Sequence, residues 1–447
     1  MLSVNEQIYG ASLIWSEAKY NFPFWNIRKD LDWDKEYQKV LSKVSKPMDI
    51  LDYYLELMKF ISLLNDGHTF ISFPKEIKKE IKTLPIKIKC LNKKHIVVNV
   101  AKDCQIPLFS EIYKINNIDF NDYMNKKIFP YCWNIKPSSA YEMLYTFSFI
   151  DDDANKSAYS LIPLLEKDKK IELLTSNGLY TINPTNENIK WSLPTSLEIN
   201  EKLIDKFISK GLIIQYTYDN IAILTLPTFM DDMMPQNFYN QLEQLKDCKG
   251  FIIDIRNNGG GNSDYADAFS QAFIKGRFQS GKVKHSIHIG AYKAWGEGVD
   301  YSTWNLNDPW NKKVYDICNN NLFEEEITTA YFPNCPLTLE QPVVILENTA
   351  TASSSENLLI NFNAINRATI VGTASYGSTG NPLSINLPGG GNANICTRRY
   401  TYPDNKEFIN IGVEPHIYAE LTQDDMINRY DSVLAKGLKV LREKINN

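Results

Sequence analysis

The spacing of apolar residues predicts a mainly helical segment over residues 1–75. One stretch places four apolar side chains at intervals of three and four residues, which puts them on one face of a helix. These residues are Leu51, Tyr54, Leu55 and Met58. We expect this helix to end at Gly67 in a left-handed conformation and a short strand to follow over residues 69–73. His68 would then lie at a rigid corner between a helix and a strand.

Between residues 76 and 135, apolar and polar positions alternate, which predicts a small β-rich module. Strands are expected over residues 84–91, 96–100 and 112–117. The pattern is least regular in the connecting region, residues 136–209. Within it, Ser176-Asn177-Gly178 separates two apolar runs and indicates a hairpin.

From residue 210 to 447, short apolar runs alternate with helical patterns, as in α/β proteins. Buried strands are expected over residues 221–226, 250–256, 342–346 and 368–372. Helices are expected over residues 238–245, after residue 263 and over residues 424–446. An insert at residues 276–340 is rich in aromatic residues. Its apolar positions follow neither the helical nor the strand period, so we expect it to be irregular. It would be either a lid or substrate wall or a satellite hydrophobic cluster.

Length and composition are typical of a globular protein with about three domains. Of the 447 residues, 43% are hydrophobic and 23% are charged. The net charge of −5 does not predict nucleic-acid binding, which usually requires a basic face. The most basic run, Lys75–Lys94, is interpreted as the solvated lysine face of a strand. No window approaches the ~18 uninterrupted apolar residues of a membrane span.

The cysteines do not indicate a metal site. All seven are scattered and none forms a C-x-x-C pair, so neither a zinc site nor a disulfide framework is expected. Calcium-loop and phosphate-loop patterns are also missing, and we expect no cofactor. The first residues lack the basic and apolar regions of a signal peptide. As the sequence stands, a cytoplasmic protein is expected, or an exported one if a signal peptide has been removed.

A corner of small residues, Thr349–Glu356, joins an expected strand to an expected helix. Such a corner can hold a serine hydroxyl at the open end of a sheet, and Ser353 is our candidate nucleophile. The alternative is a capping box, in which Ser353 and Glu356 satisfy backbone N–H groups without any chemistry. This stretch taken alone favours the cap.

Three glycines, Gly259–Gly261, follow the expected strand over residues 250–256. Without side chains, such a turn can point its N–H groups outward to hold a phosphate or an oxyanion. The lysine and serine or threonine of a phosphate loop do not follow. A tight turn that needs positive φ is an equally good interpretation of these glycines.

Four segments together resemble the serine peptidase family of the C-terminal processing (tail-specific) proteases and the tricorn core protease. They are Asp254–Gly261 for "D-L-R-x-N-x-G-G", Thr351–Glu356 for "S-A-S-A-S-E", Arg367–Gly380 for "R-A-x-x-V-G-x-x-T-x-G" and Gly412–Pro415 for "G-V-x-P-D". This resemblance implies a catalytic serine at Ser353 and the crotonase-like ββα superhelix shared with the Clp protease. Leu64–Thr69 resembles the tricorn-like branch, whose histidine lies at the place of His68. The hairpin over residues 112–117 is similar to that of PDZ domains, which pair with peptides along a sheet edge.

One departure from the family pattern concerns the base. The tail-specific branch carries a lysine twenty-five residues after the serine, and here that position is Ser378. A serine nucleophile needs a base within hydrogen-bond reach, and the resemblance implies that His68 is this base. The tricorn branch has a serine directly before its histidine, where this chain has Gly67. The candidates to orient the imidazole are Asp66, Glu407 and Glu414, and the sequence does not choose among them.

The resulting hypothesis is a serine endopeptidase that cleaves unstructured peptides or protein tails through an acyl-enzyme on Ser353. The resemblance implies that the N–H groups of Gly260 and Ser354 hold the oxyanion, and that Glu356 orients the corner or caps the helix. The expected partner is a peptide or unfolded protein, and a homo-oligomer is left open. The alternative is a catalytically weak or inactive binding protein for apolar ligands or peptides, since the interphotoreceptor retinoid-binding protein shares the domain. An enoyl-CoA hydratase-like enzyme ranks last.

Overall fold

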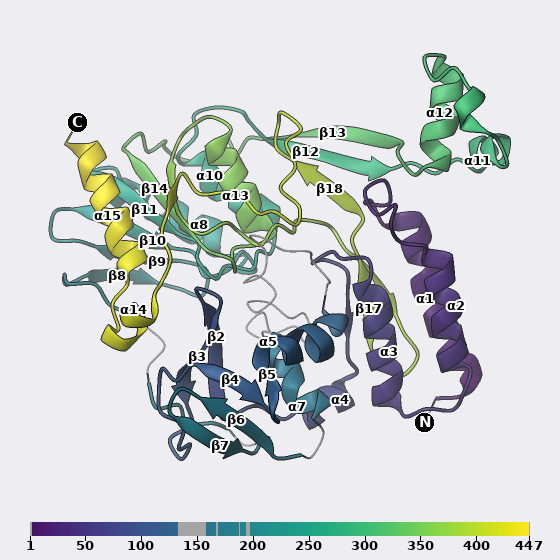
Figure 1. Cartoon of the computed structure of the whole chain (residues 1–447). Coiled ribbons are helices and arrows are strands. Elements are labelled where there is room, and N and C mark those ends of the chain that lie inside the picture. The colour runs from purple at the N-terminus through teal and green to yellow at the C-terminus, as the bar shows by residue number, and fades with distance from the viewer. Residues whose placement is uncertain (1, 133–157, 167–168, 187, 194–196, 447) are drawn as a thin grey trace.

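The computed structural model describes residues 2–132, 158–166, 169–186, 188–193 and 197–446 of the chain. Figure 1 shows three parts: helices at the N-terminus, a β-rich part and a larger α/β part. Of the connecting region expected at 136–209, residues 136–157, 167–168, 187 and 194–196 lie outside the described residues.

The α/β part is built on a seven-stranded sheet with the strand order β19-β15-β14-β11-β10-β9-β8. Its strands are β8 (Ile204–Ile208), β9 (Ile213–Tyr216), β10 (Ile221–Thr225), β11 (Gly250–Asp254), β14 (Val343–Glu347), β15 (Thr369–Gly372) and β19 (Ile417–Tyr418). The pairs from β10 to β19 are parallel, and β8 and β9 are antiparallel additions. Every residue of β11 and β14 is buried, as expected for central strands covered on both faces.

Helices cover both faces of this sheet (Figure 1). On one face, Leu438 and Leu441 of α15 (Ser432–Ile445) join Val344 and Leu346 in one apolar cluster. The other face is covered by α8 (Met234–Tyr239), α9 (Leu242–Leu245), α10 (Ser263–Gln271) and α13 (Ser354–Asn363). Because β11 and β14 are adjacent and parallel, the loops after them meet at one edge of the sheet. These two loops carry the three glycines and Ser353.

Two expected helices are interrupted in the structure. Residues 238–245 contribute to two short helices, α8 and α9, and the C-terminal helix is divided into α14 (Gln423–Asn428) and α15. The second interruption is at Arg429, whose φ of 54° is left-handed and ends α14.

The N-terminal part consists of α1 (Val4–Asn21), α2 (Trp33–Val44) and α3 (Ile50–Ser62). The left-handed residue after α3 is Asn65, with φ 60°, so the expectation of Gly67 is wrong. Asparagine is among the residues that most often adopt positive φ.

A small sheet joins the N-terminal part to the C-terminal half of the chain. β1 (Phe70–Ser72) pairs antiparallel with β17 (Asn392–Ile395), which also pairs with β16 (Leu383–Asn386). Because β1 begins two residues after His68, this pairing fixes the position of the histidine against the α/β part.

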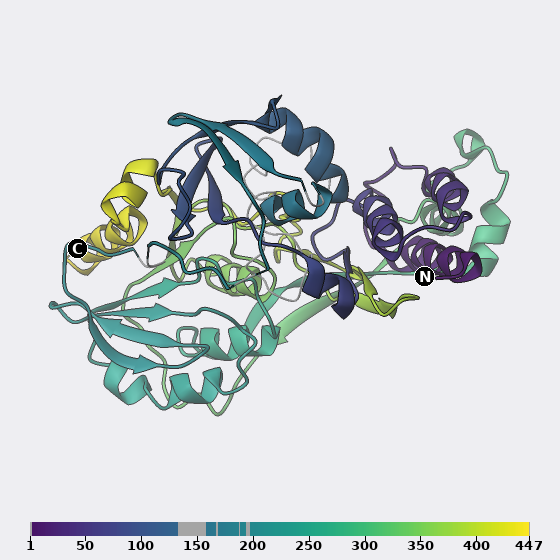
Figure 2. The same ribbon diagram turned by 90° about the horizontal axis from the view of Figure 1, so that it is seen from below.

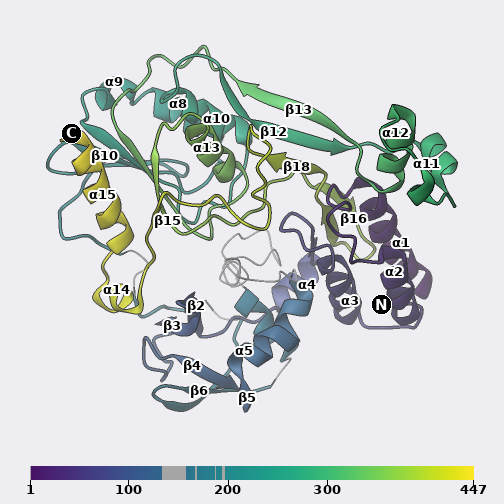
Figure 3. The ribbon, with the colours of Figure 1, turned by 45° about the horizontal axis from the view of Figure 1, so that its top comes forward.

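The β-rich part contains a two-stranded and a four-stranded sheet (Figure 3). The two-stranded sheet pairs β2 (Ile86–Leu91) with β3 (Lys94–Val100). The four-stranded sheet has the order β5-β4-β6-β7. Its strands are β4 (Ile112–Ile115), β5 (Ile118–Asp119), β6 (Ile171–Thr175) and β7 (Gly178–Ile182). The hairpin predicted at Ser176-Asn177-Gly178 is confirmed by the β6–β7 pairing. Since β6 pairs with β4, this sheet includes strands beyond residue 135. Short helices complete this part: α4 (Lys75–Glu80), α5 (Phe120–Tyr123), η1 (Met124–Ile128), η2 (Phe129–Tyr131), η3 (Ala158–Leu161) and α7 (Ile162–Leu165).

The aromatic insert is a regular arm, so the prediction of an irregular segment is wrong. Its two long strands, β12 (Phe278–Ser286) and β13 (Phe323–Ala330), pair antiparallel, and β12 also pairs with β18 (Arg398–Thr401). The far end carries α11 (Gly290–Gly296), η4 (Tyr301–Thr303) and α12 (Pro309–Cys318), beside α1 (Figures 1 and 2). There the rings of Tyr20 and His288 lie 5.5 Å apart. β13 is mostly exposed and polar, so it lacks the apolar alternation that would have revealed it.

Among the helices that the structure describes, none is both long enough and apolar enough to span a lipid bilayer.

Candidate active site

Ser353 occupies a strained backbone position directly before α13. Its φ of 58° and ψ of −124° are unusual for a residue with a side chain, and such conformations cost on the order of 1–3 kcal/mol. The Ser353 N–H donates to the Ser378 carbonyl at 3.0 Å and to Glu356 Oε2 at 3.1 Å. Ser353 is therefore the N-cap of the helix, as the capping interpretation predicted, and its hydroxyl is presented at a sharp strand-to-helix turn.

Gly260 lies directly against Ser353. A Cβ atom at Gly260 would be 2.5 Å from the Ser353 Cβ, and the φ of Gly260 is +96°, so both space and conformation require glycine. The Gly260 N–H donates to Asn258 Oδ1 at 2.9 Å. By contrast, the Ser354 N–H at the start of α13 has no hydrogen-bond partner among the described residues, and neither has the Gly261 N–H. Gly261 belongs to the glycine turn that the sequence offered as a possible oxyanion site, although the resemblance implied only Gly260 and Ser354 as donors.

His68 and Ser353, 285 residues apart, are brought together. His68 Nε2 lies 3.2 Å from the Ser353 Oγ, and His68 Nδ1 lies 2.6 Å from the Ser378 Oγ. The histidine is buried, and this burial lowers the pKa of its imidazole to about 4. A neutral ring with its proton on Nδ1 donates to Ser378, and its unprotonated Nε2 can accept the Ser353 hydroxyl proton.

Asp66 holds the backbone around the histidine. Its Oδ2 accepts the His68 N–H at 3.1 Å and the Thr69 hydroxyl at 2.6 Å. Burial raises the pKa of Asp66 to about 6, and these hydrogen bonds oppose part of the rise. The atom placed against Nδ1 is the Ser378 Oγ, which the sequence did not identify as a site residue. The available signal was its position, the one where the tail-specific branch carries lysine.

Glu356 is fully buried and accepts five hydrogen bonds. The donors are the N–H groups of Ser353, Gly377 and Ser378 and the hydroxyls of Ser375 and Thr379, at 2.6–3.1 Å. Burial raises the pKa of this carboxyl group, and the hydrogen bonds counteract that effect. Glu356 thus ties the loop at residues 375–379 to the start of α13.

Of the two remaining candidate acids, Glu407 binds Arg399 and Glu414 is exposed. Glu407 Oε1 accepts hydrogen bonds from Nε and one terminal nitrogen of Arg399, at 3.0 and 2.6 Å. Another histidine, His95, contacts Tyr159 and Asn121 in the β-rich part.

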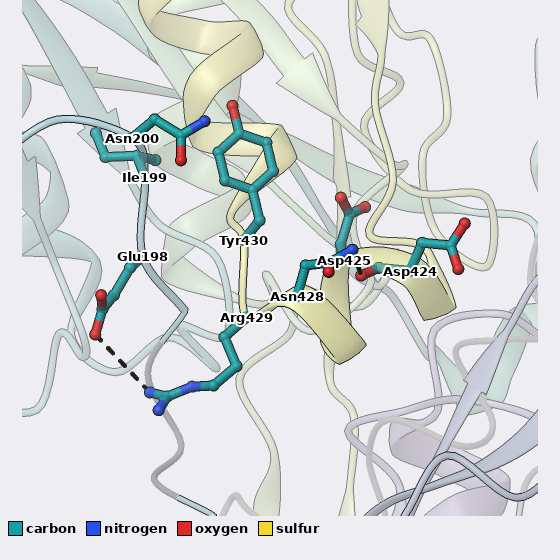
Figure 4. Close-up of a pocket in the computed structure, with 8 residues that line it drawn as sticks. All are labelled: Glu198, Ile199, Asn200, Asp424, Asp425, Asn428, Arg429 and Tyr430. Carbon is teal, nitrogen blue, oxygen red and sulfur yellow. Dashed lines mark hydrogen bonds and ion pairs between the residues drawn. The ribbon is translucent and has the colours of Figure 1, made fainter.

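The described residues contain no group of three or more histidine, cysteine, aspartate or glutamate side chains that could hold a metal ion. All seven cysteines are free thiols. A polar pocket of about 510 Å³ lies between residues 198–200 and α14, and Figure 4 shows the Glu198–Arg429 ion pair, 3.9 Å long, beside it. Its lining includes none of the predicted site residues.

Comparison with known proteins confirms the resemblance. Residues 220–419 match the model described as "Peptidase family S41". The chain is also 26% identical over 190 residues to the carboxy-terminal-processing protease of Bartonella bacilliformis. That match covers 42% of this chain and 35% of the relative, so it spans about a third of the curated protein's length.

Solved structures extend the similarity to the whole chain at the level of the fold. The structure of mature CPAF complexed with lactacystin is 17% identical, with a TM-score of 0.71 and 99% of both chains covered. A structure described as a putative peptidase from Parabacteroides merdae is 15% identical, with a TM-score of 0.54 and coverage of 99% of this chain and 97% of that one. The mixed α/β fold of this chain is therefore shared with these two structures.

Proposed function

Since residues 220–419 of this chain match the model of peptidase family S41, we propose that the protein is a serine endopeptidase with Ser353 as nucleophile and His68 as general base. The observation that carries the proposal is the 3.2 Å contact between His68 Nε2 and Ser353 Oγ. This distance is within the reach that proton transfer needs. The strained backbone of Ser353 and the glycine packed against it are further support, because both are typical of a nucleophile at a sharp strand-to-helix turn.

In the proposed reaction, His68 Nε2 takes the proton from Ser353 Oγ as the oxygen attacks the peptide carbonyl carbon. The tetrahedral intermediate collapses to an acyl-enzyme, and His68 gives its proton to the leaving amine. Water then attacks the ester, His68 again accepts a proton, and the acid product leaves with Ser353 restored. The low pKa of His68 keeps it in the neutral form that can accept a proton.

Ser378 is the proposed positioning residue for the base. By accepting a hydrogen bond from Nδ1–H, its hydroxyl favours the tautomer and the ring orientation that direct Nε2 at Ser353. Its own N–H is held by Glu356, so the same carboxylate supports the nucleophile and the residue behind the base. In this proposal Ser378 takes the place of the acid that a triad usually supplies.

The Ser354 N–H is the proposed principal oxyanion donor, because it lacks a partner among the described residues and lies next to Ser353. Gly260 would contribute after its N–H leaves Asn258 Oδ1, and the adjacent Gly261 N–H needs no such exchange. One such donor is typically worth about 10²–10³ in kcat.

The substrate class we propose is an unstructured peptide or protein tail. The catalytic domain would occupy residues 210–447 with a crotonase-like superhelix, and the helical N-terminal domain, residues 1–75, would supply the base. The PDZ-like module, predicted over residues 76–135 and extended by β6 and β7, would bind peptide along a strand edge. The pairing of β1 with β17 supports the role of the N-terminal domain, because it holds His68 in place.

The test is hydrolysis of a fluorogenic unstructured peptide by the wild type and by the Ser353→Ala and His68→Ala variants. We expect wild-type turnover and a loss of at least about 10³-fold in both variants. A serine-reactive phosphonate should label Ser353 in the wild type. Wild-type rates in both variants would refute the mechanism.

A further inference from the structure

Two methionines are exposed on the loop next to the glycine loop. Met230 is 70% exposed and Met233 is 55% exposed. The other methionines that the structure describes are half-buried or buried, as is usual for this residue. Both exposed thioether side chains therefore belong to one short segment, residues 227–234.

This segment lies against the glycine loop, across that loop from the nucleophile. The Phe229 N–H donates to the Gly260 carbonyl at 3.0 Å, and the Asn262 N–H donates to the Phe229 carbonyl at 2.9 Å. A Cβ atom on Gly261 would lie 2.7 Å from the backbone nitrogen of Met230. Gly260, the neighbouring residue, contacts Ser353, so the glycine loop touches both the Met230 backbone and the nucleophile.

The loop is ordered, and it directs Met230 outward. Phe229 is fully buried, and successive side chains of an extended segment point to opposite sides, so Met230 lies on the solvent side. The Met230 N–H donates to Thr228 Oγ1 at 3.0 Å. Asp231 accepts the N–H groups of Gly211 and Met233, at 3.0 and 3.3 Å. These bonds hold the backbone, and both methionine side chains are exposed beside it.

We infer that Met230 and Met233 form a subsite for an apolar side chain of the substrate close to the scissile bond. The inference rests on the proposed peptidase function and names its substrate class: unstructured peptides with an apolar residue near the cleaved bond. Methionine suits this role because its unbranched, polarizable side chain adapts to apolar groups of different shape. Asp231 and Asp232, between the methionines, disfavour an acidic side chain at the same place.

The test measures binding in the Ser353→Ala protein, so that no peptide is consumed. Two fluorescent Gly/Ser peptides, identical except for a central leucine or aspartate, are titrated and followed by anisotropy. We expect the leucine peptide to bind at least about tenfold more tightly, within the 10–200-fold range of apolar pocket contacts. The Met230→Ser/Met233→Ser variant in the same background should lose most of this preference.

Ile327→Ser is the matched control, because Ile327 is an apolar residue of β13 that is 58% exposed. It should keep the leucine preference. Thermal unfolding of each variant checks that the fold is intact, as expected for substitutions of exposed side chains. A leucine preference that is missing in the parent, or unchanged in the double methionine variant, would overturn the inference. Failure of the peptidase proposal is seen separately, as missing turnover and missing phosphonate labelling of the wild type.

Discussion

Ser378→Ala is the most direct test of how the base is held. The substitution removes the hydroxyl that lies 2.6 Å from His68 Nδ1 in a fully buried position. The backbone contacts of residue 378 remain, because its N–H donates to Glu356 and its carbonyl accepts from Ser353, each at 3.0 Å. The variant therefore separates the hydrogen bond to the ring from the framework around it.

The expected loss of activity follows from the Nδ1–H group of His68, whose acceptor the substitution removes. A buried donor without an acceptor costs about 1–3 kcal/mol, and the imidazolium formed during the reaction strengthens its bond to Ser378. If this energy is lost in the transition state, kcat/KM falls about 5–150-fold, since 1.36 kcal/mol corresponds to tenfold. The fall should be in kcat, because Ser378 is buried behind the ring and away from bound peptide.

The assay is steady-state hydrolysis of a fluorogenic peptide, with kcat and KM measured separately and thermal unfolding measured in parallel. Ser375→Ala is the control: its hydroxyl also binds Glu356, at 2.6 Å, but it is not the group placed on His68 Nδ1. We expect this control to lower stability more than kcat. If Ser378→Ala keeps the wild-type kcat, or if both variants lose kcat equally, the positioning role of Ser378 is refuted.

Three further predictions follow from the same geometry. Burial lowers the pKa of His68 to about 4, so the base stays neutral down to that pH. In a pH–rate profile, kcat/KM should therefore decline only as the pH falls through about 4. A midpoint near 6.5, the ordinary pKa of histidine, would contradict this prediction. Gly260→Ala places a Cβ 2.5 Å from the Ser353 Cβ at a φ of +96°, so phosphonate labelling of Ser353 should slow by at least about 100-fold while the chain still folds. Glu356→Ala leaves buried donors such as the Gly377 N–H unpaired. The free energy of unfolding, measured in urea, should fall by about 3 kcal/mol or more. A change below about 1 kcal/mol would show that these hydrogen bonds are dispensable.

The glycine loop and the serine corner were predictable from local patterns. Each follows a short, mostly apolar and fully buried strand, and adjacent parallel strands bring their following loops to one edge of a sheet. The contact of His68 with Ser353 was also anticipated, but through the resemblance of Leu64–Thr69 to a family motif and not through periodicity. The structure brings these two residues into hydrogen-bond range.

Other features depend on contacts that no local pattern encodes. Ser378 faces Nδ1 because Glu356 holds the loop at residues 375–379 against α13, which the separate sequence segments do not reveal. The arm formed by β12 and β13 has one mostly exposed polar strand, so its pairing leaves no apolar alternation. Glu407 and Asp66 looked equivalent as candidate acids, and only the pairing of Glu407 with Arg399 separates them.

The sequence by itself determined the chemistry-bearing elements: a serine at a strand-to-helix corner, a glycine loop and a histidine at a second corner. Short-range steric and hydrogen-bonding preferences fix such turns within a few residues. The tertiary structure decided which groups surround the histidine, because those contacts join segments hundreds of residues apart. It also decided that Ser378, and not one of the three candidate acids, lies at Nδ1. A short buried hydrogen bond depends on packing from several elements at once, and no single segment of the sequence specifies it.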